Sequence, residues 1–153
     1  MKAMNKKATS VLRAAVLALI MGLGLPDARA TAGAPERMTY QGFLVDGNGI
    51  ALGLESPRNY DVIFRIFSEQ SGGARKWSEQ QTVTVDKGYF SVLLGEGADV
   101  ASESRPAFSS VFTGADASDR FIAITVKGIG AGGADVDILP RLQLVTSPYA
   151  FLA

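Results

Sequence analysis

The stretch Lys76–Leu94 (KWSEQQTVTVDKGYFSVLL) decides the fold class, because its pattern is that of two β-strands joined by a tight turn. Polar and apolar side chains alternate with a period of two through Lys76–Val85, as in a strand with one buried and one wet face. Asp86-Lys87-Gly88 is a hairpin turn signal, and Tyr89–Leu94 resumes the alternation. The stretch therefore predicts an antiparallel hairpin.

Working outward from this hairpin, further short apolar runs alternate with turn clusters. We expect the other strands at Met38–Val45, Asn59–Phe67, Arg120–Val126, Ala134–Leu139 and Arg141–Val145, the last two joined at Pro140. The long segment between the fourth and fifth strands holds one predicted helical turn, Pro106–Phe112. The sequence predicts an all-β domain over residues 38–153, a roughly seven-stranded antiparallel β-sandwich of immunoglobulin-like or prealbumin-like type.

The strand alternation also predicts which side chains form the core. Apolar residues at alternate positions of a strand share one face, which packs inward. The strand Asn59–Phe67 carries apolar side chains on both faces, which is typical of a central strand. We expect six residues to be buried: Phe64, Trp77, Phe90, Val92, Ile122 and Ile124.

The first 30 residues have the three parts of a secretory signal peptide. Four basic residues precede the apolar run Ala14–Leu25, and the small-residue site Ala28-Arg29-Ala30 follows it. We predict a signal helix in residues 1–30 with cleavage after Ala30, and a flexible lead-in over residues 31–37; an uncleaved membrane anchor is the alternative. The protein is then exported, to the periplasm, the cell surface or the medium, without membrane attachment after cleavage.

Composition limits the chemistry of this chain. It has no cysteine and no histidine, so the commonest nucleophile–base pairs and the commonest metal ligand are missing. Residues 31–153 carry 10 basic and 14 acidic residues, without the clustered basic patch that nucleic acid requires. We therefore predict a protein that is not an enzyme, carries no cofactor and binds no nucleic acid.

A few residues are nevertheless candidates for a site. Asp135 and Asp137 share one side of a predicted strand and are the candidate pair for glycoside hydrolysis or a ligand contact, the alternative being a solvated strand face. Asp116 and Asp119 are candidate calcium ligands, the alternative being turn-forming residues. Trp77 is either a core residue or a platform for a sugar ring.

The chain's end carries a second group of candidates. Tyr149 and Phe151 either close one end of the fold or contact a partner. Arg141, next to Pro140, is expected to hold a carboxylate or backbone carbonyls at a sheet corner.

A series of short motifs comes in a fixed order: Tyr40-Gln41-Gly42-Phe43-Leu44, Asp46–Gly49, Gly88-Tyr89-Phe90, Pro140-Arg141 and Ser147-Pro148-Tyr149-Ala150. This order resembles an N-terminal β-sandwich module of exported bacterial surface proteins, found ahead of tail-fibre-like, repeat or coiled-coil segments. The resemblance implies a structural or adhesive module and transfers no catalytic residue. Here the chain stops at Ala153, where such proteins usually continue.

The sequence thus favours a non-enzymatic exported module for structure, adhesion or assembly at a bacterial cell surface, with self-association or an unknown protein as partner. A carbohydrate-binding module, with a glycan as partner, is the first alternative. A small hydrolase with paired carboxylates is the second.

Overall fold

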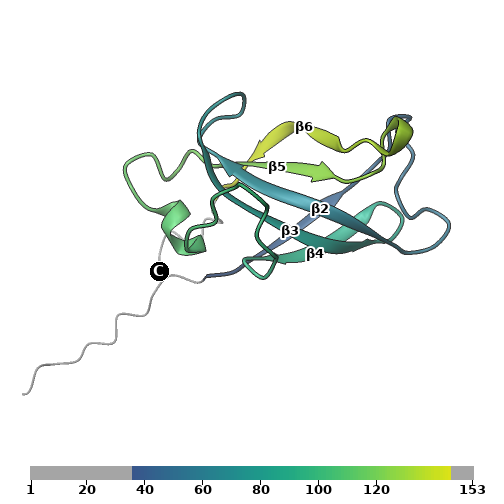
Figure 1. Ribbon diagram of the computed structural model, residues 1–153, viewed down its shortest axis with the longest axis horizontal. Helices are drawn as coiled ribbons and strands as arrows, with labels where there is room; N and C mark the ends of the chain where they lie inside the picture. The colour runs from purple at the N-terminus through teal and green to yellow at the C-terminus, as the bar shows by residue number, and fades with distance from the viewer. Residues whose placement is uncertain (1–35, 146–153) are drawn as a thin grey trace, which may run out of the picture. The chain divides into compact units, whose positions relative to one another are not determined.

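Six strands in two antiparallel sheets make up residues 36–145, the part of the chain that the computed structural model describes (Figure 1). The predicted all-β class is confirmed. The elements are β1 (Met38–Phe43), β2 (Arg58–Phe67), β3 (Arg75–Val85), β4 (Tyr89–Leu94), the 3₁₀-helix η1 (Phe108–Phe112), β5 (Phe121–Val126), the 3₁₀-helix η2 (Ala131–Gly133) and β6 (Val136–Gln143). The predicted signal peptide lies outside the described residues, as does most of the lead-in.

The two sheets differ in size. β1 pairs with β4 alone, and the second sheet has the order β3-β2-β5-β6. β2 is therefore a central strand, as predicted, and both of its faces are covered: Val62, Phe64 and Ile66 are 0% exposed, and Ile63 on the opposite face is 7% exposed.

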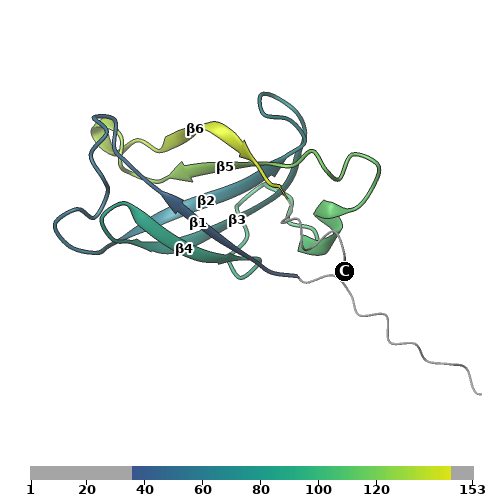
Figure 2. The same ribbon diagram turned by 180° about the vertical axis from the view of Figure 1, so that it is seen from behind.

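The core lies between the two sheets. The rings of Tyr40 in β1 and Phe90 in β4 each have their centroid 6.3 Å from that of Phe64 in β2. Figure 2 shows β1 and β4 lying across β2 and β3, with β5 and β6 on the far side of β1 from β4. Of the six predicted core residues five are buried, and Val92 is half-buried against the same cluster.

The predicted total of seven strands is wrong, because Pro140 does not divide the last part of the chain into two strands. β6 continues through it: Ile138 pairs with Ile124 before the proline, and Leu142 pairs with Ile122 after it. The register shifts between these pairs, so Leu139, Pro140 and Arg141 form a bulge opposite Ala123. β6 is an edge strand, where a residue without a backbone N–H is tolerated.

The predicted hairpin of β3 and β4 is wrong: Asp86 and Tyr89 form one bridge beside the turn, after which β3 pairs with β2 and β4 pairs with β1 in the other sheet. The turn itself has the conformation that its sequence predicts. Lys87 and Gly88 both have positive φ, +49° and +86°, as in the two-residue turns that match the twist of paired strands. Gly88 is required for a second reason, because a Cβ there would lie 2.4 Å from the ring of Phe43. The turn thus brings the end of β1 against the start of β4.

Candidate functional site

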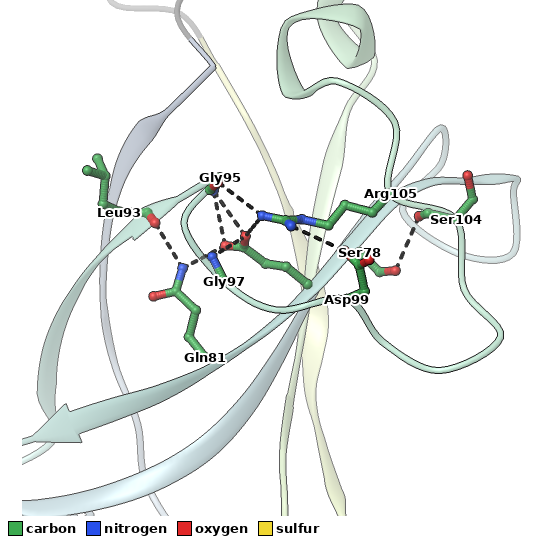
Figure 3. Close-up of polar contacts among 9 residues, drawn as sticks. Ser78, Gln81, Leu93, Gly95, Gly97, Asp99, Ser104 and Arg105 are labelled. Carbon is green, nitrogen blue, oxygen red and sulfur yellow. Dashed lines mark hydrogen bonds and ion pairs between the residues drawn. The ribbon is translucent and has the colours of Figure 1, made fainter.

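Glu79 is an acidic residue buried in β3, with 0% of its surface exposed. Its carboxylate accepts hydrogen bonds from the backbone N–H of Gly95 at 3.1 Å and of Gly97 at 2.8 Å, and from Nε2 of Gln81 at 2.6 Å (Figure 3). Nη2 of Arg105 donates a further bond at 3.1 Å and compensates the charge. A buried carboxylate with this many donors is held in one position.

Arg105 closes the loop that surrounds this carboxylate. The same guanidinium donates to the backbone carbonyl of Gly95 at 3.0 Å and to the carboxylate of Asp99 at 3.2 Å (Figure 3). The two ends of the segment 95–105 are therefore bonded to each other as well as to Glu79.

The segment 95–105 also covers the free edge of β3. Gln80 and Ala98 exchange two backbone hydrogen bonds of 2.9 Å each, so the loop adds one rung to the edge strand. On the face of β3 opposite to Glu79, the hydroxyl of Ser78 donates to the carbonyl of Ser104 at 3.3 Å. Successive side chains of a strand point to opposite faces, so the loop contacts both sides of β3. This coverage protects the edge from pairing with another strand.

Glu103 fixes the same loop on the outer face of the larger sheet. Its carboxylate accepts from Nε and Nη2 of Arg65 at 3.0 and 2.9 Å, and Nε of Arg75 lies 3.4 Å away. The hydrogen bond from Arg65 is the main reason that the pKa of Glu103 lies below its ordinary value. The chain of contacts continues from Nη1 of Arg65 to the Thr125 hydroxyl at 2.8 Å, and from that hydroxyl to Asp137 at 2.5 Å.

A small hollow lies beside the Glu79 network. It has a volume of about 240 Å³ and is lined by Glu36, Trp77, Gly95, Arg105, Pro106, Ala107 and Phe108. Its charged side chains already have partners, because Glu36 accepts hydrogen bonds from the backbone and hydroxyl of Ser109 at the start of η1. These contacts lower the pKa of Glu36.

A larger groove lies on the outer face of β1 and β4. It has a volume of about 640 Å³ and is lined by Gln41, Gly42, Phe43, Thr84, Tyr89, Phe90 and Ser91. Two large aromatic side chains are exposed in it: Phe43 by 51% and Tyr89 by 69%. They are cross-strand partners whose ring centroids are 4.9 Å apart at an interplanar angle of 67°.

The structure gives Asp135 and Asp137 different partners. Asp135 precedes β6 and accepts from the backbone N–H of Gly128 at 3.1 Å, which closes the turn after β5. Asp137 accepts from the hydroxyl of Thr125. Neither carboxylate is part of a buried cleft, since both residues are exposed.

The calcium candidates lie beside basic side chains. The carboxylate of Asp116 is 3.4 Å from Nη2 of Arg120 and 3.7 Å from Nζ of Lys76, and the Arg120 hydrogen bond lowers its pKa. The backbone carbonyl of Asp119 accepts a hydrogen bond from Nη1 of Arg120. Within residues 36–145 no three acidic side chains converge as a metal site would require.

The structure describes two of the four remaining sequence candidates, Trp77 and Arg141. Trp77 is 1% exposed and packs edge-on against Phe108 of η1 at 5.0 Å, so the core reading is confirmed and the sugar platform is excluded. Tyr149 and Phe151 lie outside the described residues. Arg141 donates to the carbonyls of Glu69 and Gly72, as expected, and stacks 3.5 Å above the ring of Phe67.

Sequence reasoning missed the charged residues that organise the loops. Glu79 lies an even number of residues from Trp77 and Val83, so it shares the inward face of the strand with them. This placement is the signal that could have identified Glu79 as a buried acid. Arg120 is 3% exposed and donates to the carbonyls of Val111, Asp116 and Asp119, but no sequence pattern marks it.

A family model covers residues 39–141, and its description is a domain of unknown function, DUF8740. The chain belongs to this family. The match runs from β1 into β6, so it includes both sheets and the Glu79 network. No curated protein and no solved structure matches the chain. No helix in residues 36–145 is long and apolar enough to cross a membrane.

Proposed function

We propose that this DUF8740 chain is a non-enzymatic, exported structural module of a bacterial cell surface, which assembles when an extended segment of a second copy pairs with β1. Immunoglobulin-like or prealbumin-like topology, and kinship with the modules that precede tail-fibre-like segments, are part of the same proposal. The observation that carries it is the open edge of β1.

The backbone geometry of β1 supports this assignment. Leu44 donates to the carbonyl of Gly88 at 2.8 Å, and paired residues of antiparallel strands alternate between bonded and non-bonded pairs. Thr39, Gln41 and Phe43 therefore turn their backbone N–H and C=O groups away from β4. Among residues 36–145 no backbone group bonds to them.

The edge strands β3, β6 and β1 differ in how their free edges are protected. The free edge of β3 is covered by the loop 95–105, and β6 carries a proline and a bulge, both of which discourage pairing with another strand. β1 has neither device, and its sheet has only two strands, fewer than an independently stable sheet usually needs. A third strand at β1 would complete this sheet.

The inner face of β6 offers apolar surface to such a strand. Leu142 pairs with the buried Ile122 and so points to the inner side of the sheet, yet it is 57% exposed. β6 lies on the side of β1 opposite to β4 (Figure 2). A strand added to β1 therefore reduces the exposure of this apolar surface.

The partners of the acidic residues favour a structural role over hydrolysis. Asp135 closes a turn, Asp137 bonds Thr125, and Glu79 and Glu103 are each paired with arginine. These four carboxylates are thus bonded to other groups of the fold, whereas a glycosidase needs two carboxylates that face each other across a substrate cleft.

The oligomeric mass of the exported protein tests the proposal. Gln41→Pro removes an N–H that points to the open edge and leaves the β1–β4 bonds intact, while Gln41→Ala keeps that N–H and changes only the side chain. Sedimentation should show assemblies for the wild type and for Gln41→Ala, and monomers for Gln41→Pro. A monomeric wild type, or equal assembly of the two variants, would contradict the proposal.

A further inference from the structure

We propose that the groove on the outer face of β1 and β4 is a binding site for an uncharged glycan, with Tyr89 as the surface on which a sugar ring stacks. The site uses side chains on the outer face of β1 and β4, whereas the proposed assembly uses backbone groups at the edge of β1. The inference therefore extends the proposed function to adhesion and does not depend on assembly.

The aromatic side chains provide the stacking surface. Tyr89 is 69% exposed on a strand whose neighbouring side chain, Phe90, is buried, so its exposure follows from strand alternation and not from local disorder. An aromatic face carries partial negative charge and attracts the weakly positive C–H groups of a sugar ring. Phe43 meets Tyr89 edge to face, so the two rings form a corner instead of a flat platform.

The ring of Phe43 packs against the backbone of Gly88 and the ring of Tyr89. Its ring lies against Gly88, where even a Cβ atom would come within 2.4 Å of it, and its other neighbour is the Tyr89 ring at 4.9 Å. Gly88 has a φ of +86°, which disfavours other residues at this place. An aromatic wall that is already formed lowers the entropy cost of ligand binding.

The polar side chains of the groove match sugar hydroxyl groups. Gln41 and Ser91 are joined only by a long contact of 3.5 Å, so an amide N–H, an amide oxygen and a hydroxyl stay available for a ligand. The Thr84 hydroxyl donates to Asn59 at 2.8 Å and keeps its acceptor capacity. These groups surround the aromatic corner on β1, β3 and β4.

The charge of the lining selects the class of ligand. None of the seven lining residues is an acid, a lysine or an arginine. An anionic glycan or a phosphorylated ligand would find no cation in the groove, and a basic peptide would find no carboxylate. Aromatic faces flanked by neutral hydroxyl and amide groups complement a ligand with both C–H and O–H surfaces, which is the chemistry of a neutral sugar.

A glycan array followed by titration with the neutral oligosaccharide that gives the strongest signal tests the site. The exported protein is compared with Tyr89→Ala, Gln41→Ala and the control Leu139→Ala, which removes an apolar side chain of comparable exposure (77%) from β6. Loss of the stacking ring should weaken binding roughly tenfold or more, and the control should bind like the wild type. Thermal melting of each variant shows that the fold is intact.

Three results would overturn the inference. One is an array on which no neutral glycan binds, and another is binding of acidic glycans alone. The third is a neutral glycan that Tyr89→Ala binds as tightly as the wild type does. Because Gln41→Ala is expected to assemble normally, a defect in glycan binding by this variant is distinguishable from failure of the proposed assembly.

Discussion

Arg105 donates a hydrogen bond to the buried carboxylate of Glu79 across 3.1 Å, although 26 residues separate the two in the chain. The pair fixes the segment 95–105 to the inward side of β3, and Glu103 fixes the same segment to the outer side through Arg65. The loop is thus held on both sides of an edge strand by two arginine–carboxylate pairs. Its purpose in the fold is to cover that edge.

Removing the charge of Glu79 should destabilise the protein strongly. Glu79→Gln leaves Arg105 with a neutral partner and turns an N–H₂ group toward backbone donors, and breaking one side of a buried pair costs about 3–5 kcal/mol. Urea unfolding measures the loss. The control is Glu96→Gln, which breaks an exposed ion pair with Arg37 and should cost less than about 1 kcal/mol. Equal losses in the two variants would contradict the structural role of Glu79.

Acid should weaken the contacts of Glu103 on the outer face. Its pKa in the folded protein is lowered from the ordinary value of 4.5, first by the hydrogen bond from Arg65. A lowered carboxyl pKa adds stability that is complete above the ordinary value and is lost as the pH falls through the folded value. Glu103→Gln should therefore reduce stability at neutral pH and flatten its fall below pH 4.5.

Unfolding curves of the wild type and Glu103→Gln across this pH range give the comparison. The carboxyl groups of Glu36, Asp46 and Asp116 also have lowered pKa values, so the variant retains part of the acid dependence. Only the difference between the two proteins reports on Glu103. Parallel curves would show that Glu103 makes no pH-dependent contribution.

The centre of the core should tolerate little loss of volume. Phe64 is 0% exposed and contacts Tyr40 and Phe90 across the two sheets, so Phe64→Ala should cost about 3–5 kcal/mol. Leu139→Ala, at a site 77% exposed, should change stability by less than about 0.5 kcal/mol. A cost under about 1 kcal/mol for Phe64→Ala would mean that this contact between the sheets is unimportant.

The strands could be predicted because the alternation of apolar and polar residues is a local property of the sequence. The existence of β3 and β4 and the buried faces of β2 and β5 follow from period two, and the turn at Lys87-Gly88 follows from its residue types. The pairing of β3 and β4 with strands of two different sheets does not follow from local sequence. Pro140 misled the strand count because a proline ordinarily ends a strand, whereas here it lies in a bulge of an edge strand.

The loop contacts could not be predicted in the same way. Arg105 and Glu103 lie in a segment without periodicity, and nothing in their neighbourhood indicates partners on β3 and β2. Glu79 was predictable in part, since its inward position follows from Trp77, but the donors around it come from a distant segment. The aromatic groove likewise needs the pairing of Phe43 with Tyr89, which depends on the register of two non-consecutive strands.

Export should remove the first 30 residues. The site Ala28-Arg29-Ala30 follows a short apolar run, and signal peptidase cleaves after such a site. Mass spectrometry of the protein from the periplasm or medium should therefore find Thr31 at the N-terminus. Recovery of intact chains beginning at Met1 in the membrane fraction would instead support an uncleaved anchor.

Truncation after Thr146 should separate two roles of the C-terminal residues Tyr149 and Phe151. Two apolar side chains are exposed just before this segment: Leu142 by 57% and Val145 by 78%. If the segment covers that surface, its removal should cost about 1 kcal/mol or more and lower the melting temperature by several degrees. If the melting temperature is unchanged and assembly is lost, the segment is an interaction element and the closing role is wrong. The double variant Tyr149→Ser with Phe151→Ser, which keeps the chain length, controls for the loss of backbone.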